Sequence, residues 1–246
     1  LDNCDGHDNG HPDASVTHNF VDPGYGITAR AINQKPTKNL TVVNSRFRGN
    51  KRKGIDGHAV IGFSAIGNRV IESMVCGIFA NYYSNGVTYD VQILNNYIKN
   101  CGYHAAAQGA IQANNVASGT LQPSNLDISH NTVVDCASSG GYNAIISAAT
   151  FKRLTMIGNK VIGMDARATQ NHYAYAIGST RLDSEMLVMT GNMVDISDPK
   201  LVRGMQIYYV MQGTVSDNVV RLLHDSVVYG IYLNGNDLVN CTGNVA

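Results

Sequence analysis

The chain of 246 residues has no tryptophan, only two glutamates (Glu72 and Glu185) and no excess of either charge, with 18 Lys+Arg against 18 Asp+Glu. Balanced charge at a charged fraction of 15% excludes nucleic-acid binding through a basic surface and polybasic contact with membranes. No apolar run approaches the roughly 20 residues of a membrane span, so we expect no membrane insertion. The scarcity of strong helix formers such as Glu and Lys disfavours a mainly helical protein.

The five cysteines are widely spaced, and none belongs to a Cys-x-x-Cys pair, which argues against a structural zinc site or a thioredoxin motif. Their odd number also argues against a disulfide framework, so we expect free thiols and assembly in a reducing compartment. The chain starts at Leu1 without Met and without a signal-like segment, which predicts a piece excised or processed from a longer protein.

Asparagine and glycine are abundant instead, with 26 and 25 residues, and asparagine recurs in a repeat that runs through the chain. At steps of 24 to 35 residues an Asn recurs, and from Asn68 onward it is followed two residues later by an apolar side chain: Asn44, Asn68, Asn96, Asn131, Asn159, Asn192, Asn218 and Asn244. A small residue followed by an apolar one recurs in phase with it: Gly26-Ile27, Gly54-Ile55, Gly77-Ile78, Ala110-Ile111, Ala144-Ile145, Ala176-Ile177, Gly204-Met205 and Gly230-Ile231. From Asn68 onward the residue three before each Asn is apolar, whereas Thr41 breaks this rule at Asn44.

Eight such units predict an all-β chain, a right-handed parallel β-helix that forms a single-stranded solenoid of about eight coils. A leucine-rich repeat would need a regular Leu pattern, and propeller blades would need about 40 residues each. We interpret the repeated Asn as an inward ladder whose amides hydrogen-bond along the stack. Residues 1–24 are expected to form an N-terminal partial coil or loop segment, and residues 25–246 the β-helix domain.

The repeat also assigns side chains to the two faces of each strand, because successive side chains alternate. With the apolar anchor residue inward, two columns point outward, one and three residues later. The first is Thr28, Asp56, Phe79, Gln112, Ile146, Gly178, Gln206 and Tyr232, and the second is Arg30, His58, Asn81, Asn114, Ala148, Thr180, Tyr208 and Asn234. Strands about 4.8 Å apart bring the polar members of neighbouring coils together on one rigid face, which suits a sugar chain. From these columns and the strand ends we expect the following residues to bind substrate: Arg30, Arg52, Asn81, Tyr82, Tyr83, Gln112 and Asn114.

Asp56 and His58 lie two residues apart on one predicted strand, so both point to the same face. A carboxylate beside an imidazole orients the ring and tunes its pKa, which gives a general acid or base near neutral pH. We therefore expect Asp56, His58 and the nearby Lys53 to be catalytic. The alternative is a surface strand with incidental polar residues.

The repeat resembles the pectate-lyase superfamily of right-handed β-helices, which is common among phage tailspike depolymerases. Two stretches are similar to the active-site strands of mannuronan C-5-epimerases: Lys53-Gly54-Ile55-Asp56-Gly57-His58 and, a coil later, Phe79-Ala80-Asn81-Tyr82. The resemblance implies that Asp56 and His58 match the family's catalytic pair. Lys53 stands where the family has a Tyr, and Asn81 about where it has a second Asp, which disfavours epimerisation.

A lyase removes the proton next to a uronate carboxylate and needs a cation, a base and a proton donor. The candidates are Arg30 or Arg52 as the cation, His58 or Lys53 as the base, and Tyr82 or Tyr83 as the donor. A glycoside hydrolase needs two carboxyls, and Asp56 is the only one in the two columns, unless Asp5 lies two strand steps away in one more coil. We expect β-elimination on an acidic capsular polysaccharide or exopolysaccharide, with a hydrolase or C-5-epimerase on the same face, or a non-catalytic polysaccharide-binding or fibre β-helix, as alternatives.

The expected partner is a polysaccharide substrate, with no nucleic acid and no cofactor, although Ca²⁺ could bridge a uronate to Asp56. The His- and Asp-rich run over residues 5–18 matches no metal-ligand spacing and is expected to be a polar loop. By resemblance to tailspikes, we expect the intact protein to be a homotrimer in a virion tail or outside the cell.

Overall fold

The computed structural model describes residues 1–9, 24–30, 35–81, 88–104, 108–114, 125–137, 144–167, 172–178, 184–198, 201–222 and 229–246. These residues form 24 β-strands, which belong to three parallel sheets of eight strands each. Within these ranges, no helix is long and apolar enough to cross a membrane.

Successive strands belong in turn to three sheets, named A, B and C. Sheet A contains β3 (Thr37–Val43), β6 (Val60–Ile66), β9 (Tyr89–Leu94), β12 (Asn125–Ser129), β15 (Arg153–Ile157), β18 (Ser184–Thr190), β21 (Val210–Ser216) and β24 (Leu238–Thr242). Sheet B contains β1 (Asp5–His7), β4 (Arg46–Arg48), β7 (Arg69–Ile71), β10 (Tyr97–Lys99), β13 (Thr132–Cys136), β16 (Lys160–Met164), β19 (Met193–Ile196) and β22 (Val219–Leu222). Sheet C contains β2 (Ile27–Arg30), β5 (Lys53–His58), β8 (Cys76–Asn81), β11 (Gly109–Asn114), β14 (Ala144–Ala149), β17 (His172–Gly178), β20 (Leu201–Tyr208) and β23 (Tyr229–Asn234).

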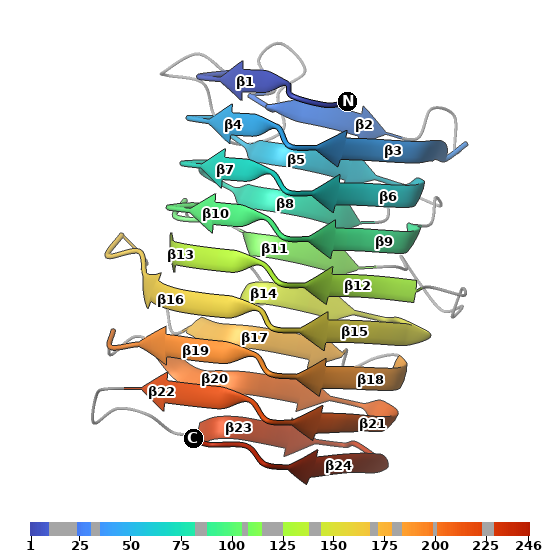
Figure 1. The fold of residues 1–246 in the computed structure, drawn as a ribbon, viewed down its shortest axis with the longest axis vertical. Helices are drawn as coiled ribbons and strands as arrows, with labels where there is room; N and C mark the ends of the chain where they lie inside the picture. The colour runs from blue at the N-terminus through green and yellow to red at the C-terminus, as the bar shows by residue number, and fades with distance from the viewer. Residues whose placement is uncertain are drawn as a thin grey trace.

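The chain winds as a right-handed coil. In Figure 1 the strands of sheets A and B run to the left on the near side, and those of sheet C return to the right behind them, while the chain descends from β1 to β24. Because every pairing is parallel and every third strand pairs, each coil stacks directly on the one before. The predicted right-handed parallel β-helix is confirmed.

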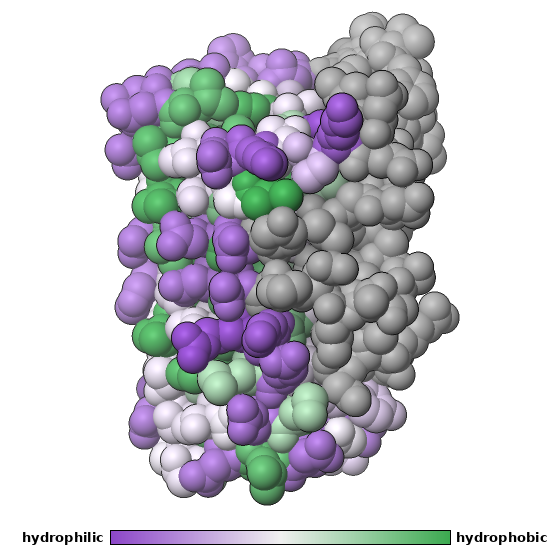
Figure 2. Space-filling view, turned by 90° about the vertical axis from the view of Figure 1, so that its right-hand side faces the viewer, coloured by the Kyte–Doolittle hydropathy of each residue, from purple (hydrophilic) through white to green (hydrophobic). Residues whose placement is uncertain are grey.

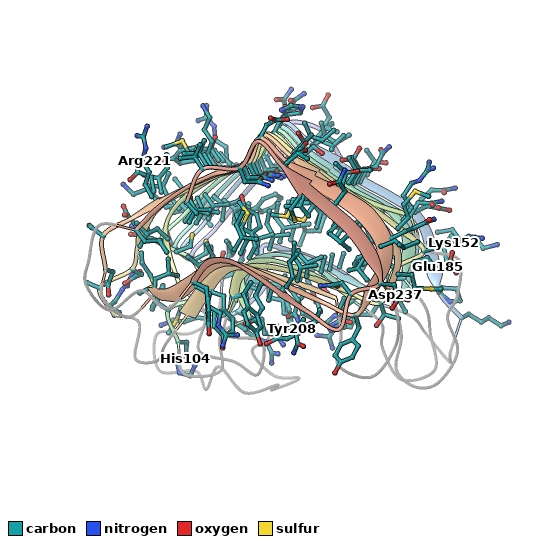
Figure 3. All side chains as sticks on the ribbon, turned by 90° about the horizontal axis from the view of Figure 1, so that it is seen from below. His104, Lys152, Glu185, Tyr208, Arg221 and Asp237 are labelled. Atoms are coloured by element: carbon teal, nitrogen blue, oxygen red, sulfur yellow. The ribbon has the colours of Figure 1, made fainter. Side chains whose placement is uncertain are left out.

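Side chains from all three sheets fill the interior, which Figure 3 shows from the end of the stack. Besides other buried residues of the same strands, such as Val91 and Leu126, sheet A sends one row of side chains into this core, one residue per coil: Val42, Ala65, Ile93, Ile128, Met156, Met189 and Val215. From Ala65 onward these are the apolar residues three positions before each repeated Asn. The repeat therefore marks the core of each coil as well as its turn.

The predicted asparagine ladder is confirmed over most of the chain. Nδ2 of Asn96, for example, donates to Oδ1 of Asn131 (3.0 Å) and to the backbone carbonyl of Ala65 (2.8 Å), and the N–H of Asn96 also donates to Oδ1 of Asn131 (3.0 Å). The same bonds link Asn68, Asn96, Asn131, Asn159, Asn192, Asn218 and Asn244. Each amide thus satisfies backbone groups of the turn and joins two coils.

The prediction of Asn44 as a ladder residue is wrong by one position. Ser45 occupies that place, and its N–H donates to Oδ1 of Asn68 at 3.0 Å. Asn44 instead has a φ of 48°, the left-handed conformation that Asn tolerates better than most residues. The shift explains why Thr41 breaks the apolar pattern, because Val42 is the residue that points inward there.

Small residues at the start of the sheet C strands let the backbone pass close to side chains of sheet B. A Cβ on Gly54 would lie 2.3 Å from Cγ1 of Val70, and one on Gly77 would lie 2.7 Å from Cγ2 of Ile98. Both glycines therefore face the interior, as the following residue does, so the regular alternation of side chains is interrupted there. We call this feature the glycine corner.

The predicted register is correct in six coils and wrong in β14 and β17. Ile146 pairs with Ile111, and Tyr175 pairs with Ile146, so these residues take the anchor positions assigned to Ile145 and Ile177. The outward positions of the two strands belong to Ser147, Ala149, Ala176 and Gly178, in place of Ile146, Ala148 and Thr180. In β17 a small residue precedes an apolar one twice, as Ala174-Tyr175 and Ala176-Ile177, and the buried Tyr175 takes the anchor position. In β14 the anchor Ile146 follows Ile145, so the small residue of the pattern is missing there.

All five cysteines are free thiols, as predicted, and Cys76, Cys101 and Cys136 are buried. The N–H of Cys101 faces Sγ of Cys136 at 3.3 Å, and the N–H of Ser73 faces Sγ of Cys101 at 3.4 Å. These thiols form a second stack that accepts weak hydrogen bonds from turn backbone.

Candidate active site

The two predicted columns on the outer face of sheet C are joined by a third, three residues earlier, so that each coil presents positions i, i+3 and i+5. The sets are Tyr25, Thr28 and Arg30; Lys53, Asp56 and His58; Cys76, Phe79 and Asn81; Gly109, Gln112 and Asn114; Ala144, Ser147 and Ala149; Tyr173, Ala176 and Gly178; Arg203, Gln206 and Tyr208; and Tyr229, Tyr232 and Asn234. Charged and aromatic residues gather towards the two ends of this face, and small residues lie between them.

Lys53, Asp56 and His58 form a compact cluster. Nζ of Lys53 donates to Oδ1 of Asp56 (3.0 Å), and Nδ1 of His58 lies 2.9 Å from Oδ2. Lys53 and Asp56 are buried, with 2% and 0% of their side chains exposed, whereas 13% of His58 is exposed. The glycine corner at Gly54 explains why Lys53, which simple alternation would turn inward, shares a face with Asp56.

The preceding coil adds hydroxyl and guanidinium groups to this cluster. Oγ1 of Thr28 donates to Oδ2 of Asp56 (2.9 Å), and Nη2 of Arg30 lies 3.8 Å from the same oxygen. Arg30 also donates to the hydroxyl of Tyr25. The guanidinium carbons of Arg30 and Arg52 lie 5.1 and 5.3 Å from the centre of the Tyr25 ring. Three cationic side chains, Lys53 included, thus gather around one carboxylate.

The following coil supplies Phe79, whose ring contacts both Lys53 and His58. Nζ of Lys53 lies 3.0 Å from the ring centre, and the His58 ring centre lies 4.8 Å away at an interplanar angle of 49°. Because Phe79 is itself buried, it shields the Lys53–Asp56 pair from water and supports the imidazole.

Burial and neighbouring charges set the protonation states in the cluster. Burial alone would raise the pKa of Asp56, but the Lys53 ammonium and the hydrogen bond to His58 outweigh it and hold that pKa well below its usual range. Burial lowers the pKa of Lys53, and Asp56 opposes this shift. Burial also lowers the pKa of His58 below its ordinary value of 6.5, against the opposing bond to Asp56. His58 is therefore a neutral base at neutral pH, with its Nδ1–H donated to the carboxylate.

Two side chains near the cluster carry buried polar atoms that have no hydrogen-bond partner among the described residues. These atoms are Nε and Nη1 of Arg52 and Oε1 of Gln112, whose side chain is almost fully buried. An unpaired buried donor or acceptor costs free energy, so a ligand that satisfied these atoms would bind favourably. The guanidinium donors of Arg52 suit an anion, and the amide oxygen of Gln112 suits a hydroxyl.

Of the residues predicted for the site, the structure brings four into direct contact: Arg30, Lys53, Asp56 and His58. Arg52 joins them through the Tyr25 ring, and Asn81 pairs with His58 in register on the neighbouring strand. Gln112 lies one strand further, opposite Phe79. Tyr82 and Tyr83, and the side chain of Asn114, lie outside the described residues.

Three contributors to the cluster are absent from the predicted site: Tyr25, Thr28 and Phe79. Thr28 and Phe79 occupy the first predicted column, so the register contained the signal for both. Tyr25 precedes the anchor glycine of its coil, and the glycine corner turns it onto the outer face in a way that alternation does not predict.

Asp5 supplies no second carboxylate to this face. Its strand, β1, pairs with β4 in sheet B, where Asp5 lies opposite Arg46. The prediction that Asp5 lies two strand steps from Asp56 is therefore wrong, because the first strand enters the stack one sheet earlier. In the part of the chain that the structure describes, no group of three or more His, Cys, Asp or Glu residues could hold a metal ion.

A second cluster, centred on Arg203, occupies the same three columns near the other end of sheet C. Arg203 donates to Oε1 of Gln206, and its Nη1 lies 3.3 Å from the Tyr208 hydroxyl, which points outward in Figure 3. Its guanidinium carbon lies 4.2, 5.4 and 5.4 Å from the ring centres of Tyr232, Tyr173 and Tyr229. None of these side chains is a carboxylate or an imidazole, so the Arg203 cluster offers hydrogen bonds and aromatic faces without a general base.

Comparison with known protein families, characterised proteins and solved structures finds no match for this chain. The chemistry of the site is therefore argued from its own geometry.

Proposed function

We propose that the protein is a polysaccharide depolymerase that cleaves an acidic capsular polysaccharide or exopolysaccharide by β-elimination at the cluster around Asp56 and His58. One observation carries the proposal. A neutral, partly exposed imidazole is held by a buried carboxylate beside the guanidinium groups of Arg30 and Arg52. Removal of a proton next to a carboxylate requires such a base together with fixed cations.

In the proposed reaction, Arg30 or Arg52 binds the uronate carboxylate and stabilises the negative charge that develops as the adjacent C–H bond breaks. His58 takes this proton on Nε2, because its Nδ1–H is donated to Asp56. The electron pair of the C–H bond forms a double bond in the sugar ring as the glycosidic C–O bond breaks, and the leaving oxygen takes a proton from a hydroxyl group.

Tyr25 is the candidate for this proton donor among the described residues. Its hydroxyl accepts a hydrogen bond from Arg30. Burial, together with the charge of Asp56, raises the pKa of Tyr25, so the phenol is protonated at neutral pH and has a proton to donate. Tyr82 and Tyr83 are the candidates from the sequence.

Asp56 and Lys53 are positioning residues in this proposal. Both are buried, so neither reaches a substrate directly. The Lys53 ammonium keeps the carboxylate charged, and the carboxylate orients His58 and stabilises the imidazolium that forms. The burial of Lys53 favours His58 as the base.

The other reactions considered for this face have less support. Asp56 is the only carboxylate in the described part of the outer columns. Because its pKa is low, it is ionised and has no proton to donate as the acid of a hydrolase. A C-5-epimerase resembling the mannuronan enzymes would have a Tyr where the buried Lys53 stands. A non-catalytic polysaccharide-binding or fibre β-helix is the second candidate, favoured by the Arg203 cluster, which can bind a sugar but has no base.

The proposal extends to the family and setting of the protein. The parallel β-helix and the strand around Asp56 and His58 support membership of the pectate-lyase superfamily, with a resemblance to phage tailspike depolymerases. On that basis we propose a homotrimer, in a virion tail or outside the cell, that acts without a cofactor. Light scattering of the intact protein tests the assembly, and a stable monomer would contradict it.

A product assay on alginate, polygalacturonate and a set of acidic capsular polysaccharides tests the reaction. A lyase leaves unsaturated uronate ends, which absorb in the ultraviolet, whereas a hydrolase leaves new reducing ends without that absorbance. We expect His58→Ala to lower product formation by about 10²–10⁴-fold. Asn234→Ala, in the same column at the far end of sheet C, should leave it unchanged. If the protein binds a polymer but forms no product from any of those tested, the proposal of an enzyme is contradicted and the non-catalytic β-helix is favoured.

A further inference from the structure

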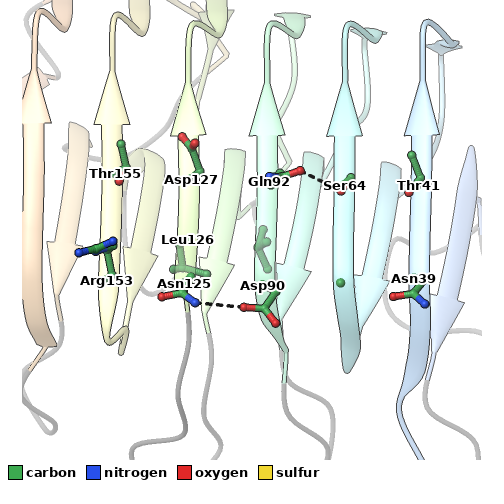
Figure 4. Close-up of a pocket in the computed structure, with 12 residues that line it drawn as sticks. Asn39, Thr41, Ser64, Asp90, Gln92, Asn125, Leu126, Asp127, Arg153 and Thr155 are labelled. Carbon is green, nitrogen blue, oxygen red and sulfur yellow. Dashed lines mark hydrogen bonds between the residues drawn. The ribbon is translucent and has the colours of Figure 1, made fainter.

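A hollow lies on the outer face of sheet A, on a different side of the coil from the Asp56–His58 cluster (Figure 4). Its volume is about 690 Å³, and it crosses the strands β3, β6, β9, β12 and β15. The lining residues form two rows, Asn39, Gly62, Asp90, Asn125 and Arg153 in the first and Thr41, Ser64, Gln92, Asp127 and Thr155 in the second. Between the rows, Val91 and Leu126 are buried and form the floor.

The backbone of the first row accounts for the shape of this surface. Asn39, Gly62 and Asp90 have φ values of 56°, 72° and 54°. Such left-handed residues are rare within strands, where Gly, Asn and Asp tolerate them best. Because they lie side by side in three successive coils, the strands bend at the same level and the sheet surface is curved there.

The side chains of the hollow offer both hydrogen-bond donors and acceptors. Nδ2 of Asn125 donates to Oδ1 of Asp90 (3.2 Å), and Oγ of Ser64 donates to Oε1 of Gln92 (3.3 Å), as Figure 4 shows. The amide and carboxylate oxygens keep further lone pairs, and the second N–H of each amide is available for a ligand. The surface is therefore ordered by its own hydrogen bonds without being saturated by them.

The charge of the hollow is opposite to that of the Asp56–His58 cluster. Asp90 and Asp127 are the carboxylates of the lining, and Arg153 is its cation. Three cations accompany a single carboxylate at Asp56, so an anionic ligand that suits the cluster would be repelled at the hollow. The hollow favours a ligand without negative charge.

The polar rows have a defined length. They cross five strands, which corresponds to about 19 Å along the axis of the coil at about 4.8 Å per strand. In the next strand, β18, the corresponding positions hold Met186 and Val188, so the polar surface ends there. Figure 2 shows hydrophilic side chains interspersed with hydrophobic ones along the left of the view, where sheet A is seen from the side.

We propose that this hollow binds an uncharged stretch of a polysaccharide, laid across the strands from β3 to β15. Hydroxyl, amide and carboxylate groups recur at the strand spacing, and they match the hydroxyls of successive sugars, which both donate and accept hydrogen bonds. An apolar peptide would meet two rows of polar and charged side chains, and a nucleic acid would meet two carboxylates with one cation. The site stands on its own residues and does not depend on β-elimination at His58.

Affinity electrophoresis through gels that contain dextran, soluble starch, galactomannan or mixed-linkage β-glucan tests the proposal, with calorimetry on the polymer that retards the protein most. At least one of these uncharged polymers should retard the wild-type protein. Asp127→Ala should weaken that binding about tenfold, the effect of losing one hydrogen bond to a charged group. Thr155→Ala should weaken it less, and Thr214→Ala, in the same row two strands further, is the matched control and should not weaken it.

The outcomes separate this site from the proposed active site. His58→Ala should bind the uncharged polymer as well as wild type does, even where it has lost product formation. Retardation by none of the uncharged polymers would overturn the proposal, and so would equal binding by Asp127→Ala and Thr214→Ala. Retardation by polyuronates alone would assign binding to sheet C and overturn it too. Circular dichroism and the melting temperature of each variant verify that its fold is intact.

Discussion

The clusters at Lys53 and Arg203 occupy the same three columns of sheet C, five strand steps apart, and differ in chemistry. Lys53 bonds to Asp56 as Arg203 bonds to Gln206, in each case to the side chain three residues later. The third position holds an imidazole in the first cluster and the Tyr208 phenol in the second. In the first cluster the acceptor is the Asp56 carboxylate, and the ion pair with Lys53 is buried. In the second cluster the acceptor is the neutral amide of Gln206, and Arg203 and Tyr208 are partly exposed.

The difference separates what the coil provides from what the residues provide. The coil, with its glycine corner, places a long cation, an acceptor and a third side chain on one face wherever the pattern i, i+3, i+5 is filled. Only the carboxylate of Asp56 and the ring of His58 turn that placement into a general base. Geometry without them yields a binding surface, which is how we interpret the Arg203 cluster.

Removing the cation from each cluster should give the largest difference between the two, measured as the loss in the free energy of unfolding. Lys53→Met leaves the buried carboxylate of Asp56 without its ammonium partner and should lower the free energy of unfolding by about 3–5 kcal/mol. Arg203→Met leaves a neutral amide and should cost about 1 kcal/mol. Denaturant unfolding followed by circular dichroism measures both. Equal losses would show that ionisation does not distinguish the clusters, and Lys53→Met combined with Asp56→Leu should recover much of the loss.

Lowering the pH should affect only the first cluster. The folded protein holds the pKa of His58 below its ordinary 6.5, so the unfolded chain binds a proton first as the pH falls. The free energy of unfolding should therefore decrease from about pH 6.5 downward until the folded-state pKa is passed, by about 1.4 kcal/mol per unit of pKa difference. The acid limb of the proposed lyase activity should likewise have its midpoint below 6.5.

Unfolding measurements between pH 7 and 5 on wild type and on His58→Gln test this sign. The variant should lose the slope that belongs to His58, while Tyr208→Phe should keep it. A wild-type stability that rises as the pH falls through this window would mean that folding raises the pKa of His58, contrary to its burial.

The smallest effect is expected where an imidazole is placed in the second cluster. Tyr208→His lies on a half-exposed side chain and should change stability by no more than about 1 kcal/mol. In a His58→Ala background it should restore no product formation, because Gln206 provides no carboxylate to orient and charge-stabilise the ring. Restored cleavage would show that the column position alone suffices.

Much of the fold can be predicted from the sequence because two positions accept few residue types. Asn96 donates to Asn131 and accepts from Asn68 within the stack, and Gly54 leaves room for Val70. The register is harder to predict in two strands. In β14 the anchor Ile146 follows Ile145 instead of a small residue, and in β17 two small residues, Ala174 and Ala176, are each followed by an apolar one. Burial of Tyr175, which no local pattern reveals, selects the correct pair.

The candidate site was predictable only in part. Alternation correctly puts Asp56 and His58 on one face, but it cannot show that Asp56 is buried or that the glycine corner turns Lys53 towards it. The hollow on sheet A leaves no motif in the sequence, since residues such as Asn39 and Asp90 suggest turns until their left-handed conformations are found within paired strands.

The corner between sheets A and B has the same length in every coil, with the ladder residue three positions after the inward residue of sheet A, as Asn96 follows Ile93. The segment from the ladder residue to the small residue at the start of sheet C varies in length. It spans nine positions from Ser45 to Gly54 and fifteen from Asn159 to Ala174. The turn between sheets A and B thus has a constant number of residues along the whole stack. Differences in coil length are confined to the connections from sheet B to sheet C and from sheet C to sheet A. Connections at the two borders of sheet C can therefore be exchanged, in evolution or by design, to change the ligand that the outer face recognises. The pairing register of the strands would stay the same.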